Sequence, residues 1–207
     1  MKNTVFILSI LIGVTTYAQK TIELDTYTLS YFTDKEPYKI EVSYDKKNRP
    51  VFWIEAQPTE NFEDKISIKV EAKHIPLFKE IFTESKNKYI EWSDVAKDNN
   101  VNKMSKVIKT NNSRFAVLFV QYRTYYMSQK SLIESTFILS EEHESPILLV
   151  GNKYKLEATA NQFTTHKGFY IAFSSVKEID AFLETLSIEK ANKALSQVIK
   201  EDELFVD

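Results

Sequence analysis

The chain has 207 residues, with 27 lysines and arginines against 29 aspartates and glutamates and a net charge of −2. This slightly acidic balance argues against nucleic acid as a partner, because proteins that bind it present a basic surface. The chain contains no cysteine, which excludes disulfides, thiolate metal sites and cysteine nucleophiles. Its 3 glycines are too few for a phosphate-cradling loop or for the Gly-x-Ser-x-Gly turn of a common hydrolase fold.

An export signal is predicted over residues 1–18. Lys2 precedes the apolar run 5–14, and Thr16 and Ala18 place small residues where a signal peptidase cleaves. An uncleaved membrane anchor is the alternative, but the run is about ten residues long and a spanning helix needs roughly 20. The mature protein is therefore expected in the periplasm or in the external medium, with no membrane span.

The first part of the mature chain alternates apolar and polar residues, which is typical of strands with one solvent-facing side. Residues 38–57 are predicted to form a hairpin that turns at 46–50. A further strand is expected at 66–72. Another is expected at 22–31, with a bulge near Asp25 where the alternation slips.

The alternation gives way to a helical period at residue 75. Apolar residues then recur at spacings of three or four up to about residue 97, and Pro76 suits a first helical turn. This pattern predicts a helix over 75–97, with the polar triplet 86–88 as a candidate break. The polar segment 98–102 is the candidate boundary between two halves of the chain.

The second half is also predicted to begin with strands. The expected strands are 103–110, 114–127, 131–140, 146–150, 153–161 and 167–174. Polar residues at 111–113 and 128–130 predict hairpin turns between consecutive strands.

Helices are predicted to close the chain over residues 175–201. Ser175 and Glu178 form a capping-box pattern at the start, and a kink is expected at 185–187. Together these elements predict one α+β domain over 19–207, a mostly antiparallel sheet with helices on one side. Because each half runs strands first and helix last, an internal duplication is the alternative.

The most unusual local pattern is Gln-Tyr-Arg-Thr-Tyr-Tyr at 121–126, three tyrosines around one of three arginines. Tyrosine combines an apolar ring with a polar tip, and arginine stacks on such rings while it holds a carboxylate or a sugar hydroxyl. The candidate binding residues are Trp53, Tyr122, Arg123, Tyr125 and Tyr126. An ordinary strand end with paired aromatic side chains is the alternative.

Residues suited to acid–base chemistry are present without a recognised spacing. The histidines are His74 at a strand-to-helix junction, His143, and His166 in a turn. The strand acids are Glu55, Glu134 and Glu157, each expected to face solvent. The dense group at 141–144 is interpreted as a solvated loop, with metal binding as the alternative. We assign no catalytic residue, no metal and no cofactor.

These observations favour an exported bacterial protein that binds a small ligand or an envelope protein without performing chemistry. The first alternative is a secreted hydrolase with a carboxylate or histidine base, which a pocket with two acids or a histidine–acid pair would indicate. An apolar or tyrosine-lined pocket without acids would favour ligand binding. The second alternative is a structural adaptor in an envelope assembly, which a large exposed apolar patch would indicate.

Overall fold

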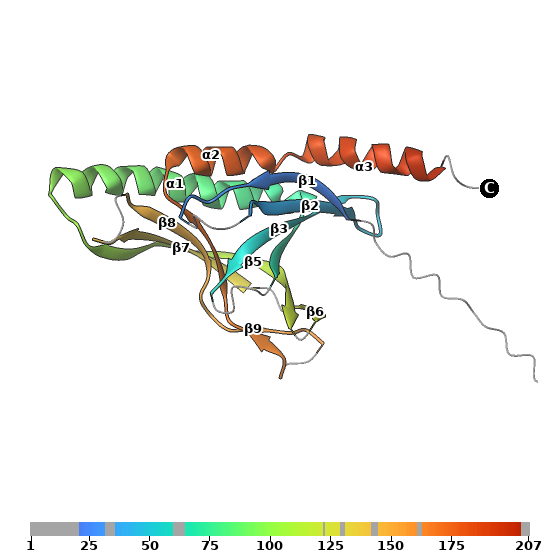
Figure 1. Cartoon of the computed structure of the whole chain (residues 1–207), viewed down its shortest axis with the longest axis horizontal. Helices are drawn as coiled ribbons and strands as arrows, with labels where there is room; N and C mark the ends of the chain where they lie inside the picture. Colours follow the sequence, from blue (N-terminus) through green and yellow to red (C-terminus); the bar gives the residue numbers. More distant parts are fainter. Residues whose placement is uncertain are drawn as a thin grey trace, which may run out of the picture.

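The computed structural model describes residues 21–31, 36–59, 65–121, 123–128, 131–141, 145–160 and 163–203. The predicted export signal lies outside the described residues. The fold is α+β and mostly sheet, as the sequence predicts (Figure 1). No helix within these ranges is long and apolar enough to cross a membrane.

The strands lie on both sides of one long helix in the chain. Those before it are β1 (Ile22–Tyr27), β2 (Tyr38–Tyr44), β3 (Pro50–Pro58) and β4 (Ile66–Glu71). Those after it are β5 (Met104–Gln121), β6 (Thr124–Met127), β7 (Ser131–Leu139), β8 (Ile147–Asn152), β9 (Leu156–Glu157), β10 (Thr165–His166) and β11 (Phe169–Phe173). The helices are α1 (Ile75–Asp98), α2 (Val176–Thr185) and α3 (Ile188–Glu203).

The large sheet is antiparallel and has the order β1-β2-β3-β11-β8-β7-β5-β4, with β6 also paired to β5. Strand β4 pairs with β3 as well, so the path of paired strands from β3 through β11 and β5 returns to β3. This closure is possible because β5 is long: its first part pairs with β7 and its last part with β4 and β6.

All three helices lie on one side of the curved sheet (Figure 1). Helix α1 contacts β4, β5, β7 and β8, whereas α2 contacts β1 and β11, and α3 contacts β1, β2 and β3. The core between helices and sheet is rich in phenylalanine, which buries a large apolar area per residue. Its fully buried phenylalanines are Phe52, Phe78, Phe82, Phe119, Phe137, Phe169, Phe173 and Phe182.

The strands of the first half follow the predictions, with one difference of length. β2 and β3 form the hairpin of 38–57, and the β1–β2 register shifts between Glu23 and Asp25, where the bulge is predicted. The strand predicted to reach residue 31 ends at Tyr27, and residues 28–31 leave the sheet.

Helix α1 is continuous, so the break predicted at 86–88 is wrong. The helical period is maintained on both sides of the triplet, because Ser85 and Tyr89 are both buried. The polar residues between them lie away from the core, where Lys86 forms an ion pair with Asp180 at 2.6 Å. A polar triplet that coincides with the outer side of a helix does not interrupt it.

The hairpin turn predicted at 111–113 is also wrong, because β5 runs through it. The β5–β7 register shifts between Asn111 and Arg114, so the polar residues form a bulge rather than a reversal. Asn111 is buried, and its Nδ2 donates a hydrogen bond to the Ile133 carbonyl at 3.4 Å. The chain reverses instead between Gln121 and Thr124, in a turn that contains Arg123 with a positive φ of 63°.

The hairpin turn predicted at 128–130 falls partly outside the described residues, but the strands on either side of it contradict a reversal. β6 and β7 pair with consecutive stretches of β5, so both run in the same direction along β5. The strand predicted at 153–161 is reduced to β9, which pairs with β10 in a small separate sheet. The kink predicted at 185–187 is present as the break between α2 and α3.

Candidate functional site

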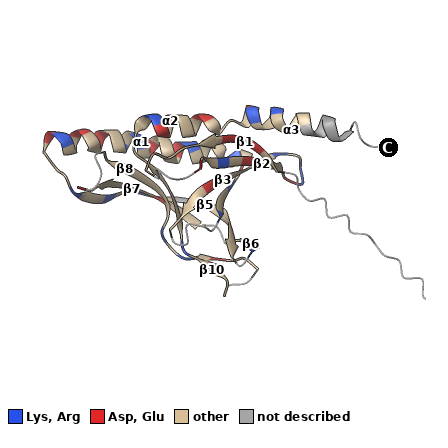
Figure 2. Ribbon diagram, viewed as in Figure 1, with Lys and Arg blue, Asp and Glu red and all other residues tan. Residues whose placement is uncertain are grey.

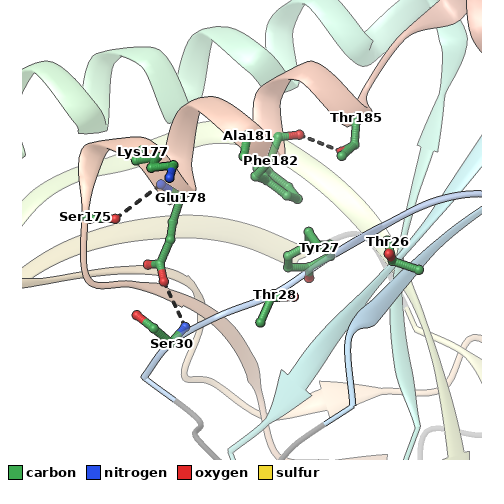
Figure 3. Close-up of a pocket in the computed structure, with 10 residues that line it drawn as sticks. All are labelled: Thr26, Tyr27, Thr28, Ser30, Ser175, Lys177, Glu178, Ala181, Phe182 and Thr185. Atoms are coloured by element: carbon green, nitrogen blue, oxygen red, sulfur yellow. Dashed lines mark hydrogen bonds between the residues drawn. The ribbon is translucent and has the colours of Figure 1, made fainter.

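A groove of about 480 Å³ lies between α2 and the chain around the end of β1 (Figure 3). Four of its lining residues come from 26–30 and six from 175–185. The two walls are far apart in the sequence, so only the folded chain forms the groove.

Glu178 ties the two walls together. Its Oε1 accepts a hydrogen bond from the Ser30 backbone N–H at 2.8 Å, and its Oε2 accepts one from Ser174 at 2.7 Å. The Ser175 hydroxyl accepts from the Glu178 backbone N–H at 3.3 Å, which caps α2 as the sequence predicts. Both carboxylate oxygens of Glu178 are therefore engaged by main-chain donors, a charge-assisted arrangement that fixes the segment beside the helix.

The floor of the groove is apolar and closely packed. The rings of Tyr27 and Phe182 are both buried and meet edge to face, with centroids 4.9 Å apart. The Tyr27 hydroxyl donates to the Glu55 carbonyl, and burial raises the pKa of Tyr27 well above its usual value. Thr185 donates its hydroxyl to the Phe182 carbonyl at 2.6 Å. The floor therefore presents neutral, internally bonded groups.

The walls provide the polar groups. Thr26, Thr28 and Ser30 bring hydroxyls from the strand side, and Lys177 brings an amino group from the first turn of α2. Glu178 is the single acid among the lining residues, and its carboxylate accepts hydrogen bonds from the backbone N–H groups of Ser30, drawn in Figure 3, and of Ser174. This arrangement can hydrogen-bond a small molecule, but it contains no pair of acids for acid–base chemistry.

Trp53, a predicted binding residue, lies away from the groove on β3. Its indole N–H donates to the Ser43 hydroxyl at 2.8 Å, and the Lys69 amine lies 5.7 Å from the ring centroid. Its neighbours in the strand, Phe52 and Ile54, are fully buried in the core. Because consecutive strand residues face opposite sides, Trp53 lies on the side of β3 that faces away from the core. These contacts describe a cross-strand cluster on the outside of the sheet.

The other predicted binding residues lie at the β5–β6 turn. Arg123 is exposed, and Tyr125 is 68% exposed. Tyr126 is half-buried and stacks on Phe119 with ring centroids 5.7 Å apart. Because consecutive strand residues face opposite sides, Tyr125 and Tyr126 do not line one surface. Tyr122 lies outside the described residues, and a binding role for this set stays a prediction.

The histidines do not enter the groove where they are described. His74 precedes α1 and makes no capping hydrogen bond with its side chain. His166 is in β10 rather than in a turn, and its buried ring lies 5.4 Å from that of Phe119. His143 lies outside the described residues, with most of the acidic group at 141–144.

Each strand acid has its own local surroundings. Glu55 accepts a hydrogen bond from the Lys39 backbone N–H at 2.9 Å, and Glu157 is exposed on β9. Glu134 faces away from the core, yet its side chain is only 12% exposed because Lys153 covers it with an ion pair of 2.8 Å. Within the described part of the chain, no three histidine, aspartate or glutamate side chains are grouped to hold a metal ion.

None of the predicted binding residues that the structure describes lines the groove. The capping box of Ser175 and Glu178 marks the start of α2, but Thr26 and Thr28 show no pattern that distinguishes them from strand residues. The chain matches no family model, no curated protein and no solved structure. Its function is therefore inferred from its own residues.

Proposed function

We propose that the protein is exported and binds a small polar molecule noncovalently in the groove between residues 26–30 and α2. The observation that supports binding is the lining of the groove, a packed apolar floor under a few hydroxyls and one amine. Its volume of about 480 Å³ falls within the roughly 300–1,000 Å³ typical of small-molecule sites.

The wall chemistry indicates a ligand that carries oxygen atoms. Hydroxyls such as those of Thr26, Thr28 and Ser30 both donate and accept hydrogen bonds, and the Lys177 amine only donates. A hydroxylated or carboxylated small molecule satisfies both kinds of group. The Lys177 amine can pair with an anionic group of a ligand, an interaction that salt weakens.

The same lining does not favour the hydrolase alternative. Hydrolysis by acid–base chemistry commonly uses two acidic side chains or a histidine with an acid. Among the lining residues of the groove, Glu178 is the single acid and there is no histidine. Binding therefore agrees better with the groove than acid–base catalysis does.

Export rests on the pattern of residues 1–18, and N-terminal sequencing of protein from its native cells tests it. We expect the processed chain to begin at Gln19 and to occur outside the cytosol. An intact Met1 on protein recovered from the cytosolic fraction would contradict export while leaving the groove untouched.

Native mass spectrometry of protein purified from its own host tests binding. We expect the wild-type chain to retain a small molecule whose mass gives its identity. Ala181→Phe places a ring in the groove, where Ala181 is exposed, and should lower the retained fraction at least about tenfold.

The matched control is Glu184→Phe, which adds the same ring at an exposed position of α2 that does not line the groove. This variant should retain the ligand as the wild type does. Lys177→Gln then separates anionic from neutral ligands, since only an anion loses affinity with the charge. If the Ala181→Phe variant retains as much ligand as the wild-type protein, the groove is not the binding site.

A further inference from the structure

The described aromatic side chains that are more than half exposed all lie in neighbouring segments, at the end of the molecule away from the helices (Figures 1 and 2). Phe163 is 87% exposed, Tyr125 68% and Tyr154 57%. They follow β9, belong to β6 and follow β8, respectively. We call this part of the fold the aromatic tip and define it as residues 123–128, 153–160 and 163–168.

Backbone hydrogen bonds hold the segments of the aromatic tip together. Ser128 forms a β-bridge with Ala158, and the Thr159 N–H donates to the Met127 carbonyl at 2.7 Å. The Ala158 N–H donates to the Thr164 carbonyl at 2.9 Å, which closes the loop that carries Phe163. The exposed rings are therefore carried on connected backbone rather than on separate loops.

A small buried cluster supports the aromatic tip from inside. The rings of Tyr126 and His166 pack on Phe119, with centroid distances of 5.7 and 5.4 Å. Leu156 and Ala158 beside them are each 1% exposed. These packed residues anchor the exposed rings, which stay in contact with water. Exposing apolar rings to water is unfavourable, and a binding partner that covered them would remove this cost.

The charge of the aromatic tip differs from that of the rest of the chain. The tip contains four exposed cations, Arg123, Lys153, Lys155 and Lys167, and one acid, Glu157, whereas the whole chain has a net charge of −2. Lys153 is paired with a carboxylate outside the tip. Exposed aromatic rings are thus combined with a local excess of positive charge.

We propose that the aromatic tip docks on the surface of a membrane that contains anionic lipids. Tyrosine and phenylalanine rings enter the interface between headgroups and acyl chains, and nearby lysines and arginines are attracted to anionic headgroups. The excess of cations over acids matches a negatively charged surface. This contact is peripheral, and it is independent of the proposed ligand groove, which lies beside α2 on the helix side of the sheet.

Co-sedimentation of the full chain with lipid vesicles tests the proposal. We expect binding to vesicles of equal parts phosphatidylglycerol and phosphatidylcholine, and little to phosphatidylcholine alone. Binding should weaken when salt rises from about 0.1 M to about 1 M, because the Debye length falls from about 10 Å to about 3 Å. The double variant Phe163→Ser with Tyr125→Ser should lower the partition coefficient at least about tenfold.

The control is a double variant of two exposed apolar residues of α1, Leu77→Ser with Val95→Ser, where Leu77 is 40% and Val95 53% exposed. It should bind as the wild type does. Two further double variants test the charge. One combines Arg123→Gln and Lys155→Gln in the aromatic tip, and the other combines Lys46→Gln and Lys47→Gln in the β2–β3 turn. Only the variant in the tip should weaken binding to anionic vesicles. Circular dichroism of each variant establishes that it is folded.

Three results would overturn the proposal. One is no binding of the wild-type chain to either vesicle. Another is an equal loss of binding in the aromatic-tip and α1 double variants. The last is binding that the tip substitutions do not weaken. Such binding would come from another segment, for example the apolar N-terminal residues that all variants share. A tip that instead captures an envelope protein would give the first result.

Discussion

At the scale of single residues, two glycines determine how closely β8 and β11 approach. A Cβ on Gly151 would lie 2.1 Å from the Phe169 carbonyl oxygen, and one on Gly168 would lie 1.6 Å from that of Asn152. Both contacts are with backbone, which has little freedom to move aside. The scarcity of glycine excludes phosphate loops from the sequence, and these two glycines serve close backbone packing instead.

Gly168→Ala should destabilise the protein by about 3 kcal/mol or more, because a methyl group inserted against a fixed carbonyl forces the strands apart. Urea unfolding followed by circular dichroism measures the loss. Ala160→Ser, which adds one atom at an exposed position, is the control and should change the free energy of unfolding by less than about 0.5 kcal/mol. A Gly168→Ala protein of wild-type stability would show that the two strands are farther apart.

Glu178→Ala should cost about 2 kcal/mol of stability, because the backbone N–H groups of Ser30 and Ser174 lose a charged acceptor. Glu178→Gln retains one carbonyl oxygen and should cost less. Chemical unfolding of both variants, with the exposed Glu184→Ala as the control, gives the comparison. If Glu178→Ala and Glu184→Ala are equally stable, the carboxylate does not hold the groove together.

At the scale of elements, the β2–β3 turn is organised by one acid. The Asp45 carboxylate accepts hydrogen bonds from the backbone N–H groups of Lys47 and Arg49 at 2.8 and 2.9 Å. It also pairs with the Arg49 guanidinium at 2.6 Å. The hydrogen bonds from Arg49, first from its side chain and then from its backbone, lower the pKa of Asp45 to about 2. Asn48 adopts a positive φ of 56°, as an asparagine in a tight turn tolerates.

The titration of Asp45 should show this organisation. Its folded pKa of about 2 is below the unfolded value, so the stabilising contribution is present above about pH 4 and is lost as the pH falls toward 2. Arg49→Gln should raise the midpoint measured by NMR toward the ordinary value. Lys46→Gln, whose side chain makes none of these contacts with Asp45, should leave it unchanged; a wild-type midpoint near 4 would contradict the arrangement.

At the scale of the whole molecule, the two halves of the chain share one sheet. β3 pairs with β11 and β4 pairs with β5, so the closed path joins two strands from before residues 98–102 to four strands from after them. Helix α1, from the first half, packs mainly on strands of the second. Helix α3, from the second half, packs in turn on β1, β2 and β3 of the first.

A fragment of residues 19–102 should therefore be unfolded by circular dichroism, because α1 would lose β5, β7 and β8 as packing partners. The full chain should unfold in a single transition, with coincident curves from tryptophan fluorescence and circular dichroism. Separate transitions, or a cooperatively folded fragment, would favour two independent halves and with them the duplication alternative.

The amino-acid pattern alone was enough to predict the elements whose residues alternate between core and solvent. The hairpin of 38–57, the helix beginning at residue 75 and the capped start at Ser175 were predictable, because burial period and caps are local properties. The same local logic failed at 86–88 and 111–113, where polar residues lie on an outer helix face and in a bulge. Polarity alone does not distinguish a turn from either of these.

The closed strand path, the groove and the aromatic tip became visible only in the folded chain. Glu178 reaches Ser30 across 148 positions of sequence, and Ser128 meets Ala158 across 30, so no local pattern contains these contacts. Side-chain period states which residues are buried, but it does not state which segments bury them together. That choice is made by long-range packing, which also sets which hydroxyls, amines and rings remain available to a ligand or a membrane.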